Sequence, residues 1–155
     1  MPVKFYRLAG EEVTAAAAPL LETALSRGLR TVVRCGPGLG VDALDALLWT
    51  YDADAFLPHG RAGDPHAARQ PVLLTDGPEA PNAPDCLMLV GGARAEDAEL
   101  SAYDRVQLIF DGEDPAALDA ARGEWRRVRG LGVVAEFWER RDGRWTLAAQ
   151  AGEGR

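Results

Sequence analysis

The amino-acid sequence predicts one α/β domain with an open, mostly parallel sheet and helices on both faces. The chain has 155 residues, of which 47% are apolar, and this is enough for a single domain with a sizeable core. Strand-like segments alternate with helical ones along the chain, which is typical of βαβ units. Three strand-like segments are continuously apolar, as expected for strands that are covered on both faces. Together these observations indicate a Rossmann-like arrangement.

The individual elements follow from local composition. Short runs of β-branched, aromatic and other apolar residues predict strands at residues 3–8, 29–35, 71–76, 86–92 and 105–112. Apolar residues at helical spacing predict helices at residues 11–28, 41–51, 95–103 and 114–130. Residues 133–147 predict two further strands, or a strand and a short helix, around the turn "DGR". A long connection rich in Gly, Pro and Asp is expected over residues 52–70.

Specific residues mark the expected helix ends. Gly28 is expected to end the first helix, and Pro19 inside it predicts either a kink or a later start, because proline lacks the N–H that a helix interior requires. In the last helix, Asp114 is expected to cap the N-terminus and Pro115 to occupy the first helical position. Gly130 is expected to end that helix.

Composition argues against several classes of protein. The formal net charge of −7 disfavours direct binding of nucleic acid, which depends on basic residues that neutralise phosphates. No segment reaches the roughly 18 apolar residues of a membrane span, and the N-terminus lacks the features of a signal peptide, so we expect a cytoplasmic protein with no membrane contact. Cys35 and Cys86 lie in apolar runs and predict buried thiols. We expect a single domain over residues 1–149 and a flexible C-terminal tail over residues 150–155.

The turn Gly36–Gly40, within "RCGPGLGVDALDALLW", has the outline of a phosphate-binding loop. Its glycines follow the pattern G-x-G-x-G, whereas a dinucleotide site requires G-x-G-x-x-G. A P-loop has Lys and then Ser or Thr where this chain has Val41 and Asp42, and the carboxylate of Asp42 would repel a phosphate. We interpret the turn as a strand-to-helix connection without a ligand. The alternative is a small nucleotide-binding enzyme or sensor domain that uses this turn.

Other candidates for chemistry are isolated. His59 and His66 share one loop with several aspartates, but their spacing matches no common set of metal ligands. Asp76 and Asp111 each end a predicted strand, where α/β enzymes place catalytic carboxylates, yet neither has a recognisable base, nucleophile or metal partner. The sequence therefore predicts no catalytic residue, no metal site and no cofactor.

The segment "LDALLWTYDADAFLPHG" (residues 44–60) has a distinctive order: a Leu-Trp pair that ends a helix, then Phe, then Pro-His-Gly. In this order it resembles the chi subunit of bacterial DNA polymerase III holoenzyme. The similarity extends over residues 4–149 and includes "FYRL", "RTVVRC", "APDCLMLVGG" and "FDGEDPAALDAARGEWRRVRGLG". It implies a non-enzymatic accessory subunit of the clamp loader, with a Rossmann-like fold and no nucleotide.

The resemblance also implies two partners. One is the acidic C-terminal tail of the single-stranded-DNA-binding protein, which ends in a hydrophobic residue and a free carboxylate. The other is the psi subunit or another component of the clamp loader. Such a protein would act as an adaptor at the replication fork.

The segment "ARGEWRRVRG" suits the first of these partners. Arg122, Arg126 and Arg129 share one helical face by their spacing, and Trp125 lies between them. Guanidinium groups bind carboxylates, and an indole offers an apolar platform for a ring, with a further cation–π attraction. The resemblance implies that Arg122, Trp125 and Arg126 form the tail-binding pocket. Leu118 stands where a family member has Lys, which would weaken binding or move its charge to Arg129. The alternative is a solvated basic face with Trp125 packed inward.

The second partner surface is implied by the resemblance alone. Trp49, Phe56, Pro58 and His59 match the region of the family that faces the psi subunit. An apolar patch at the rim of a loop suits a partner segment. The alternative is that Trp49 and Phe56 close the core beside the long loop.

Overall fold

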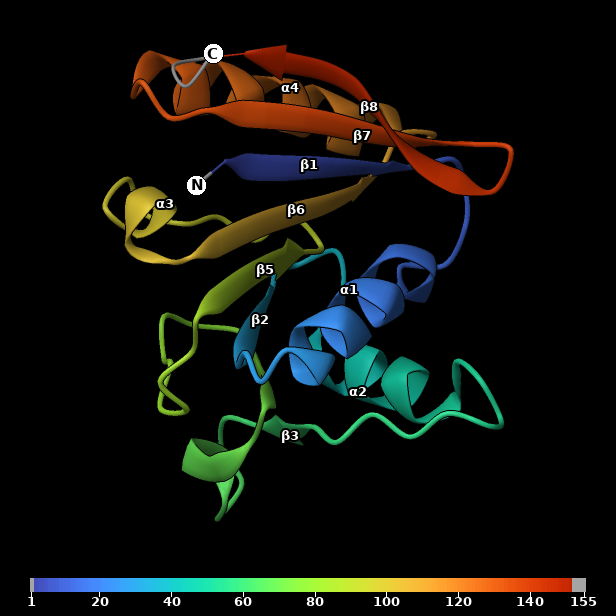
Figure 1. Cartoon of the computed structure of the whole chain (residues 1–155), viewed down its shortest axis with the longest axis vertical. Coiled ribbons are helices and arrows are strands. Elements are labelled where there is room, and N and C mark those ends of the chain that lie inside the picture. The colour runs from blue at the N-terminus through green and yellow to red at the C-terminus, as the bar shows by residue number, and fades with distance from the viewer. Residues whose placement is uncertain (1, 152–155) are drawn as a thin grey trace.

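Across residues 2–151, which the computed structural model describes, eight strands form one sheet in the order β3-β4-β2-β5-β6-β1-β7-β8 (Figure 1). The strands are β1 (Val3–Leu8), β2 (Thr31–Cys35), β3 (Gly60–Arg61), β4 (Val72–Thr75), β5 (Cys86–Val90), β6 (Arg105–Asp111), β7 (Ala135–Arg141) and β8 (Arg144–Ala151). All neighbouring strands pair in parallel, except that β8 runs antiparallel to β7. The predicted open, mostly parallel α/β sheet is therefore confirmed.

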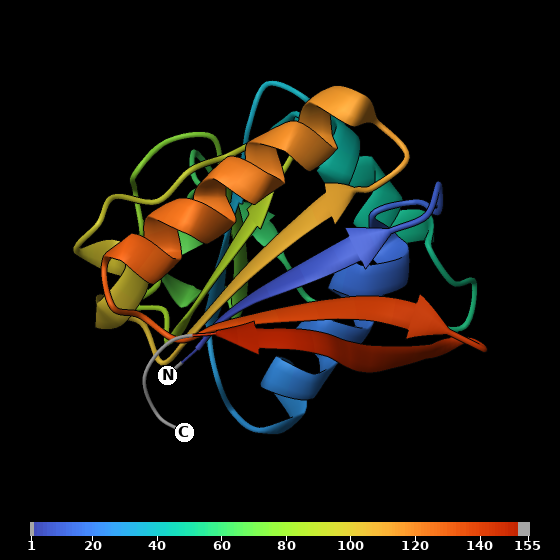
Figure 2. The same ribbon diagram turned by 90° about the horizontal axis from the view of Figure 1, so that it is seen from above.

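Helices cover both faces of this sheet (Figure 2). They are α1 (Thr14–Ser26), α2 (Val41–Thr50), the short α3 (Glu99–Ala102) and α4 (Pro115–Gly130). Apolar residues of α1 and α2 form one core with Tyr6 and Leu8 of β1, whereas α3 and α4 form a second core with Val3 and Phe5. Side chains of a strand alternate between its two faces, so β1 contributes to both cores. The central strands β2, β4 and β5 are buried along their whole length, as their continuous apolar runs predict.

The first helix differs from its prediction at its N-terminus. It begins at Thr14, so residues 11–13 precede it, and it continues through Pro19 without a later start. Pro19 is exposed, while alanines before it are buried against the sheet and hold this part of the helix in place. Gly28 ends the helix as predicted: its φ is +72°, and its N–H donates to the Leu25 carbonyl at 3.0 Å.

The last helix begins as the sequence predicts. An Asp114 carboxylate oxygen accepts a hydrogen bond from the Ala116 N–H at 3.1 Å, and Pro115 occupies the first position. The helix ends at Gly130, as the sequence predicts. The left-handed turn that follows it is made by Gly132, whose φ of +76° is a conformation that glycine adopts without strain.

The C-terminal region forms two strands, one of the two arrangements expected for residues 133–147. Asp142 and Gly143 join β7 to β8 with φ of +53° and +77°, and Asp-Gly favours such tight hairpin turns. Residue Gln150 pairs with Glu136 in this hairpin. The prediction of a tail from residue 150 is therefore wrong for its first two residues, and residues 152–155 lie outside the described part.

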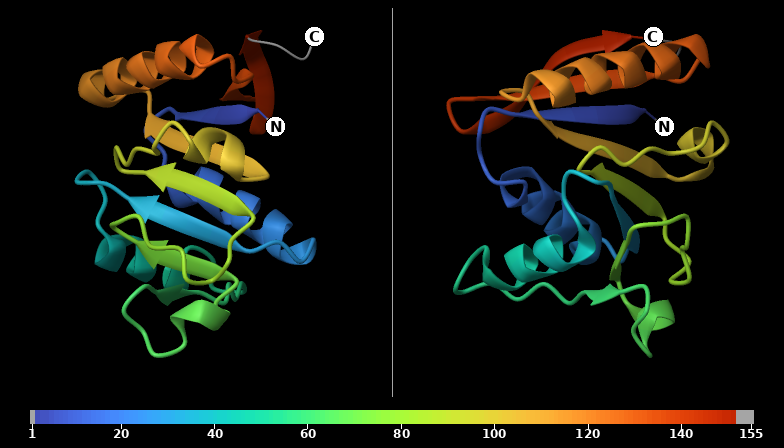
Figure 3. Two further views of the ribbon diagram at one scale, coloured as in Figure 1. Left: turned by 90° about the vertical axis from the view of Figure 1, so that its left-hand side faces the viewer. Right: turned by 180° about the vertical axis from the view of Figure 1, so that it is seen from behind.

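The predicted long connection over residues 52–70 holds the two-residue strand β3 and one short 3-10 turn, Ala67–Arg69. It runs along the β3–β4 edge of the sheet, at the opposite end of the molecule from α4, β7 and β8 (Figures 1 and 3). The molecule thus separates the two predicted partner surfaces, one on α4 and the other at the end of α2.

Candidate functional site

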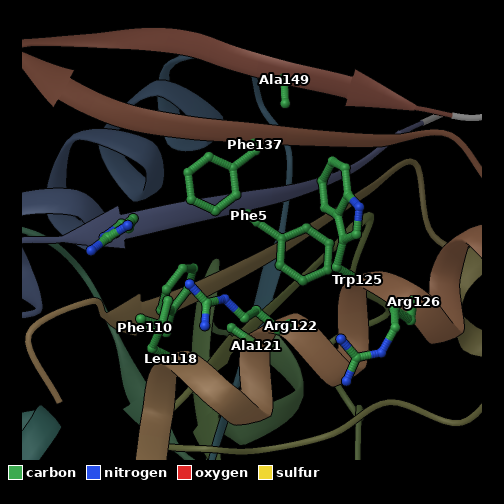
Figure 4. A pocket seen from close by; sticks show the side chains of 10 residues that line it. Phe5, Phe110, Leu118, Ala121, Arg122, Trp125, Arg126, Phe137 and Ala149 are labelled. Atoms are coloured by element: carbon green, nitrogen blue, oxygen red, sulfur yellow. The ribbon is translucent and has the colours of Figure 1, made fainter. Parts of the chain in front are cut away.

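A groove of about 300 Å³ opens between α4 and the part of the sheet that α4 only partly covers (Figure 4). Its lining comes from α4 and four strands, and consists of Phe5, Arg7, Phe110, Leu118, Ala121, Arg122, Trp125, Arg126, Phe137 and Ala149. The aromatic side chains come from β1, β6 and β7, which are neighbours in the sheet although they are far apart in the sequence. The groove is therefore an apolar hollow with arginines around it.

Trp125 forms part of the aromatic lining. Its indole lies edge-on to Phe5, with ring centroids 5.3 Å apart, and edge-on to Phe137 at 6.2 Å. Such edge-on pairs are a favoured geometry for aromatic rings. The side chain is half-buried, so its inner part packs on the sheet while its outer part borders the groove. The alternative of a Trp125 that packs inward thus holds for the inner part of the indole, which contacts Phe5 and Phe137, whereas the rest of the indole is not buried.

The arginines of α4 divide into two sets. Arg122 and Arg126 are exposed, line the groove and take part in no ion pair with any residue between 2 and 151. Arg127, by contrast, pairs with Glu124 at 2.8 Å and with Asp97 on the other side of the helix. The hydrogen bonds that Arg127 donates to these carboxylates, the one to Glu124 first, raise the pKa of Arg127. Arg122 and Arg126 are thus available to a ligand, whereas Arg127 joins α4 to the segment before α3.

The structure brings together three of the four residues predicted for the tail-binding pocket. Arg122, Trp125 and Arg126 border one groove (Figure 4). Arg129 is exposed on the same helix but lies outside the groove lining. Leu118 belongs to the lining as an apolar side chain.

Sequence reasoning missed the sheet side of the groove. Phe5 and Arg7 come from β1, and Phe137 comes from β7. The alternation of side chains along "VKFYRL" places Phe5 and Arg7 on one face. The sequence alone does not show that α4 covers that face, so Phe5 and Arg7 could not be predicted as groove residues.

Predicted residues for the second partner surface also lie together, at the end of α2 and in the loop that follows it. The rings of Trp49 and Phe56 are 6.0 Å apart, and the Trp49 indole lies 4.3 Å from the imidazole of His59. Trp49 is 51% exposed and Phe56 is 74% exposed, so the alternative that they close the core is wrong. Pro58, half-buried, lies between Phe56 and His59 in the chain. We refer to Trp49, Phe56, Pro58 and His59 as the aromatic patch.

His59 supports this patch from beneath. The imidazole is buried; its Nδ1 lies 2.7 Å from the Leu57 carbonyl oxygen, and its Nε2 lies 3.1 Å from a carboxylate oxygen of Asp45 on α2. The Nε2 contact has the distance of an ion pair but not the angles of a hydrogen bond. The contact with Asp45 joins the loop to α2, and the Trp49 indole packs against the imidazole.

The glycine turn after β2 is used for close packing of backbone. The Gly38 N–H donates to the Gly91 carbonyl at 2.8 Å, and a Cβ atom on Gly36 would lie only 2.5 Å from the same oxygen. Glycine is therefore needed here because two chain segments touch. This contact explains Gly36 and Gly38 without a ligand.

A cleft of about 670 Å³ lies beside this turn, at the edge where the parallel strands end. In α/β folds this edge is the usual place for a nucleotide. The ionisable groups around this cleft are mostly acidic: Glu11, Glu12, Asp111, Asp114 and Glu124, with Arg94 as the basic one. Such a lining repels phosphate, so the geometry gives no support to the nucleotide-binding alternative.

The cysteines are not arranged for chemistry. Cys35 and Cys86 are free and buried, and burial raises the pKa of the Cys35 thiol to about 12. A thiol with such a pKa stays protonated and is a poor nucleophile.

Between residues 2 and 151, no cluster of His, Cys, Asp and Glu could hold a metal ion. Over the same range, no helix is long and apolar enough to cross a membrane.

Comparison with known proteins identifies the family of this chain. The family described as "DNA polymerase III chi subunit, HolC" matches residues 1–136. DNA polymerase III subunit chi of Pseudomonas aeruginosa is 29% identical over 134 residues, which are 84% of this chain and 90% of that protein. The probable DNA polymerase III subunit chi of Rickettsia prowazekii is 39% identical over 49 residues, which are 32% of this chain and 30% of that protein. The chain therefore belongs to the family of DNA polymerase III chi subunits, which are accessory subunits of the replicase.

Proposed function

We propose that this protein is a non-catalytic adaptor that binds the acidic C-terminal tail of the single-stranded-DNA-binding protein and links it to the clamp loader. The observation that carries the proposal is the groove beside α4. Within it, Arg122 and Arg126 flank Trp125 above an aromatic floor, and neither arginine has a carboxylate partner between residues 2 and 151. Membership of the chi-subunit family supports a partner from the replication machinery.

The chemistry of the groove matches such a tail. Each guanidinium offers a fork of N–H donors to a carboxylate, and the hydrogen bonds are strengthened by charge. The floor of Phe5, Phe110 and Phe137 buries an apolar terminal side chain. A groove of about 300 Å³ is large enough for one or two such side chains but not for a folded domain. The net charge of the whole chain is −7, so this local cluster of arginines is required for an acidic ligand.

The aromatic patch serves, in this proposal, as the surface for the psi subunit or another component of the clamp loader. Exposed aromatic rings are typical of protein interfaces, and Trp49 and Phe56 are both more than half exposed. The patch lies at the end of α2, on the opposite face of the sheet from α4, so the two partners would not compete for space. The work of such an adaptor takes place in the bacterial cytoplasm.

Calorimetry tests the proposal. About the last ten residues of the host's single-stranded-DNA-binding protein are titrated into the full chain at about 50 mM salt, and we expect micromolar affinity because a short peptide buries little area. Affinity falls as salt increases, since exposed charges are screened. The double variant Trp125→Ala, Arg126→Ala loses binding, whereas Arg27→Ala, which removes an exposed arginine far from the groove, retains it. Unchanged affinity in the double variant overturns the proposal.

A further inference from the structure

The groove beside α4 has arginines on both of its walls. Arg122 and Arg126 come from the helix, and Arg7 comes from β1 on the side of the sheet. Arg7 lies two residues after Phe5, so both side chains project from β1 toward the face that α4 covers. Between residues 2 and 151, Arg7 takes part in no ion pair, and its one side-chain hydrogen bond is a long one, from Nη2 to the Gly112 carbonyl at 3.4 Å.

Gly112 provides the space that Arg7 occupies. A Cβ atom built at Gly112 would lie 2.6 Å from Cγ and 2.8 Å from Cδ of Arg7. No other residue is among the nearest atoms to that position. The φ of Gly112 is not in the left-handed region, so glycine is needed here for space and not for backbone conformation. The aliphatic part of Arg7 therefore lies against the backbone of Gly112, and a side chain at position 112 would displace it.

Arg7 adds to the small number of positive charges that α4 brings to the groove. On α4, Leu118 gives the groove an apolar side chain, and Arg129 lies outside the lining. Arg7 is the remaining cation that borders the groove. Arg7 of β1 thus provides a positive charge on the sheet side of the groove, in addition to those of Arg122 and Arg126 on α4.

We propose that Arg7 is a specificity-determining residue of this groove, which binds a carboxylate of the acidic peptide from the wall opposite α4. The inference rests on the proposed function, because it needs an acidic peptide in the groove. A peptide held from both walls has its carboxylates fixed on two sides, so ligands with several acidic groups bind better than ligands with one. Gly112 acts as a positioning residue, because it determines where Arg7 can lie.

Calorimetry with the same peptide and the full chain tests the inference. Arg7→Ala and Arg7→Gln are each expected to bind about tenfold more weakly, as for the loss of one charge-assisted hydrogen-bonded contact, and with a smaller dependence on salt. Gly112→Ala keeps the charge but displaces it, and is expected to weaken binding several-fold. In the Arg7→Ala background, Gly112→Ala should have no further effect, because the displaced side chain is already absent.

The outcomes separate this inference from the proposed function. If the wild-type chain does not bind the peptide, both fall. If the wild type binds and Trp125→Ala abolishes binding, while Arg7→Ala and Arg7→Gln stay within twofold of the wild type, the inference alone is overturned. A loss in Gly112→Ala that persists in the Arg7→Ala background overturns the role of Gly112. Thermal unfolding of each variant verifies that it is folded at the temperature of the titration.

Discussion

The indole of Trp125 meets the ring of Phe5 edge-on, with centroids 5.3 Å apart and planes at 68°. This contact joins α4 to β1, the strand that lies between β6 and β7 in the sheet. Arg122 is one turn before Trp125, and Arg126 follows it directly, so the position of the indole also sets the position of both cations. The shape of the groove thus depends on how α4 packs on β1, and not only on which residues line it.

Replacing Phe5 tests this link. Phe5→Leu keeps an apolar side chain but removes the edge-on contacts in a fully buried position, and we expect a loss of about 1–2 kcal/mol in the free energy of unfolding. Peptide affinity should also fall, because α4 is held less firmly over the sheet. Urea unfolding and calorimetry measure the two effects. A variant with reduced stability but unchanged affinity would show that the Phe5–Trp125 contact does not shape the groove.

The glycine turn predicts a sharp contrast between two neighbouring substitutions. Gly36→Ala forces a Cβ atom against the Gly91 carbonyl, so we expect destabilisation by about 2–4 kcal/mol. Gly40→Ala is the matched control, because a Cβ atom there meets nothing within 4 Å. Thermal unfolding measures both. Equal stability of the two variants would contradict the role of the turn in packing.

The same turn predicts the response to nucleotides. ATP, GTP and NAD should leave the melting temperature unchanged, since the ionisable groups that line the adjoining cleft are mostly carboxylates. A ligand present at 100 times its dissociation constant would add about 2.7 kcal/mol of stability and would be seen readily. A clear rise in melting temperature with any of the three would restore the nucleotide-binding alternative.

A partly buried ion pair predicts a dependence of stability on pH. Arg34 donates to both carboxylate oxygens of Glu99, at 2.9 and 2.8 Å, and this bond lowers the pKa of Glu99. Because the folded-state pKa is below the unfolded value of about 4.3, the stabilisation is complete above that value and is lost as the pH falls through the folded pKa.

The variant Glu99→Gln isolates this effect. At pH 7 it should lower the free energy of unfolding by about 1–3 kcal/mol, because the buried guanidinium of Arg34 loses its charged partner. The difference from the wild type should shrink when urea unfolding is repeated at about pH 3, where the carboxyl group of the unfolded wild type is protonated. A difference that is equal at both pH values would mean that the ion pair does not cause it.

The aromatic patch predicts a loss of partner binding without a loss of folding. Trp49 and Phe56 are exposed, so replacing both with Ala should change the free energy of unfolding by less than about 1 kcal/mol. Binding to a purified psi subunit or clamp-loader complex should be abolished, and binding of the acidic peptide should be unaffected. Retained binding to the clamp-loader components would show that the aromatic patch is not their binding surface.

The helix side of the groove could be predicted from the sequence, because helical spacing alone places Arg122 and Arg126 on one face with Trp125 between them. The same spacing placed Arg129 with them, but that residue lies beyond the groove, since a face of a helix is longer than the hollow that it borders. The sheet side could not be predicted. Phe5, Arg7 and Phe137 meet there because β1 lies between β6 and β7, and no local pattern encodes that order.

The contrast between local patterns and long-range pairing also explains which parts of the fold could be predicted. Buried strands and the Asp114–Pro115 helix start depend on neighbouring residues, and the structure confirms them. The extension of β8 to Ala151 depends on pairing with Ala135 of β7, so the polar composition of its last residues suggested a tail. The end of α4 at Gly130 is confirmed, but the left-handed turn after it lies at Gly132, because either of two nearby glycines could supply that backbone conformation.

Resonances of the indole N–H groups offer the most direct test of the acidic-peptide groove. The chain has four tryptophans, of which Trp138 and Trp145 pack on Tyr6 at the opposite face of the sheet from α4, and Trp49 belongs to the aromatic patch. On titration of the acidic peptide into the ¹⁵N-labelled chain, the account predicts a progressive shift of the Trp125 indole resonance alone among the four. A titration that shifts Trp49 in place of Trp125, or that leaves all four unchanged, would contradict it.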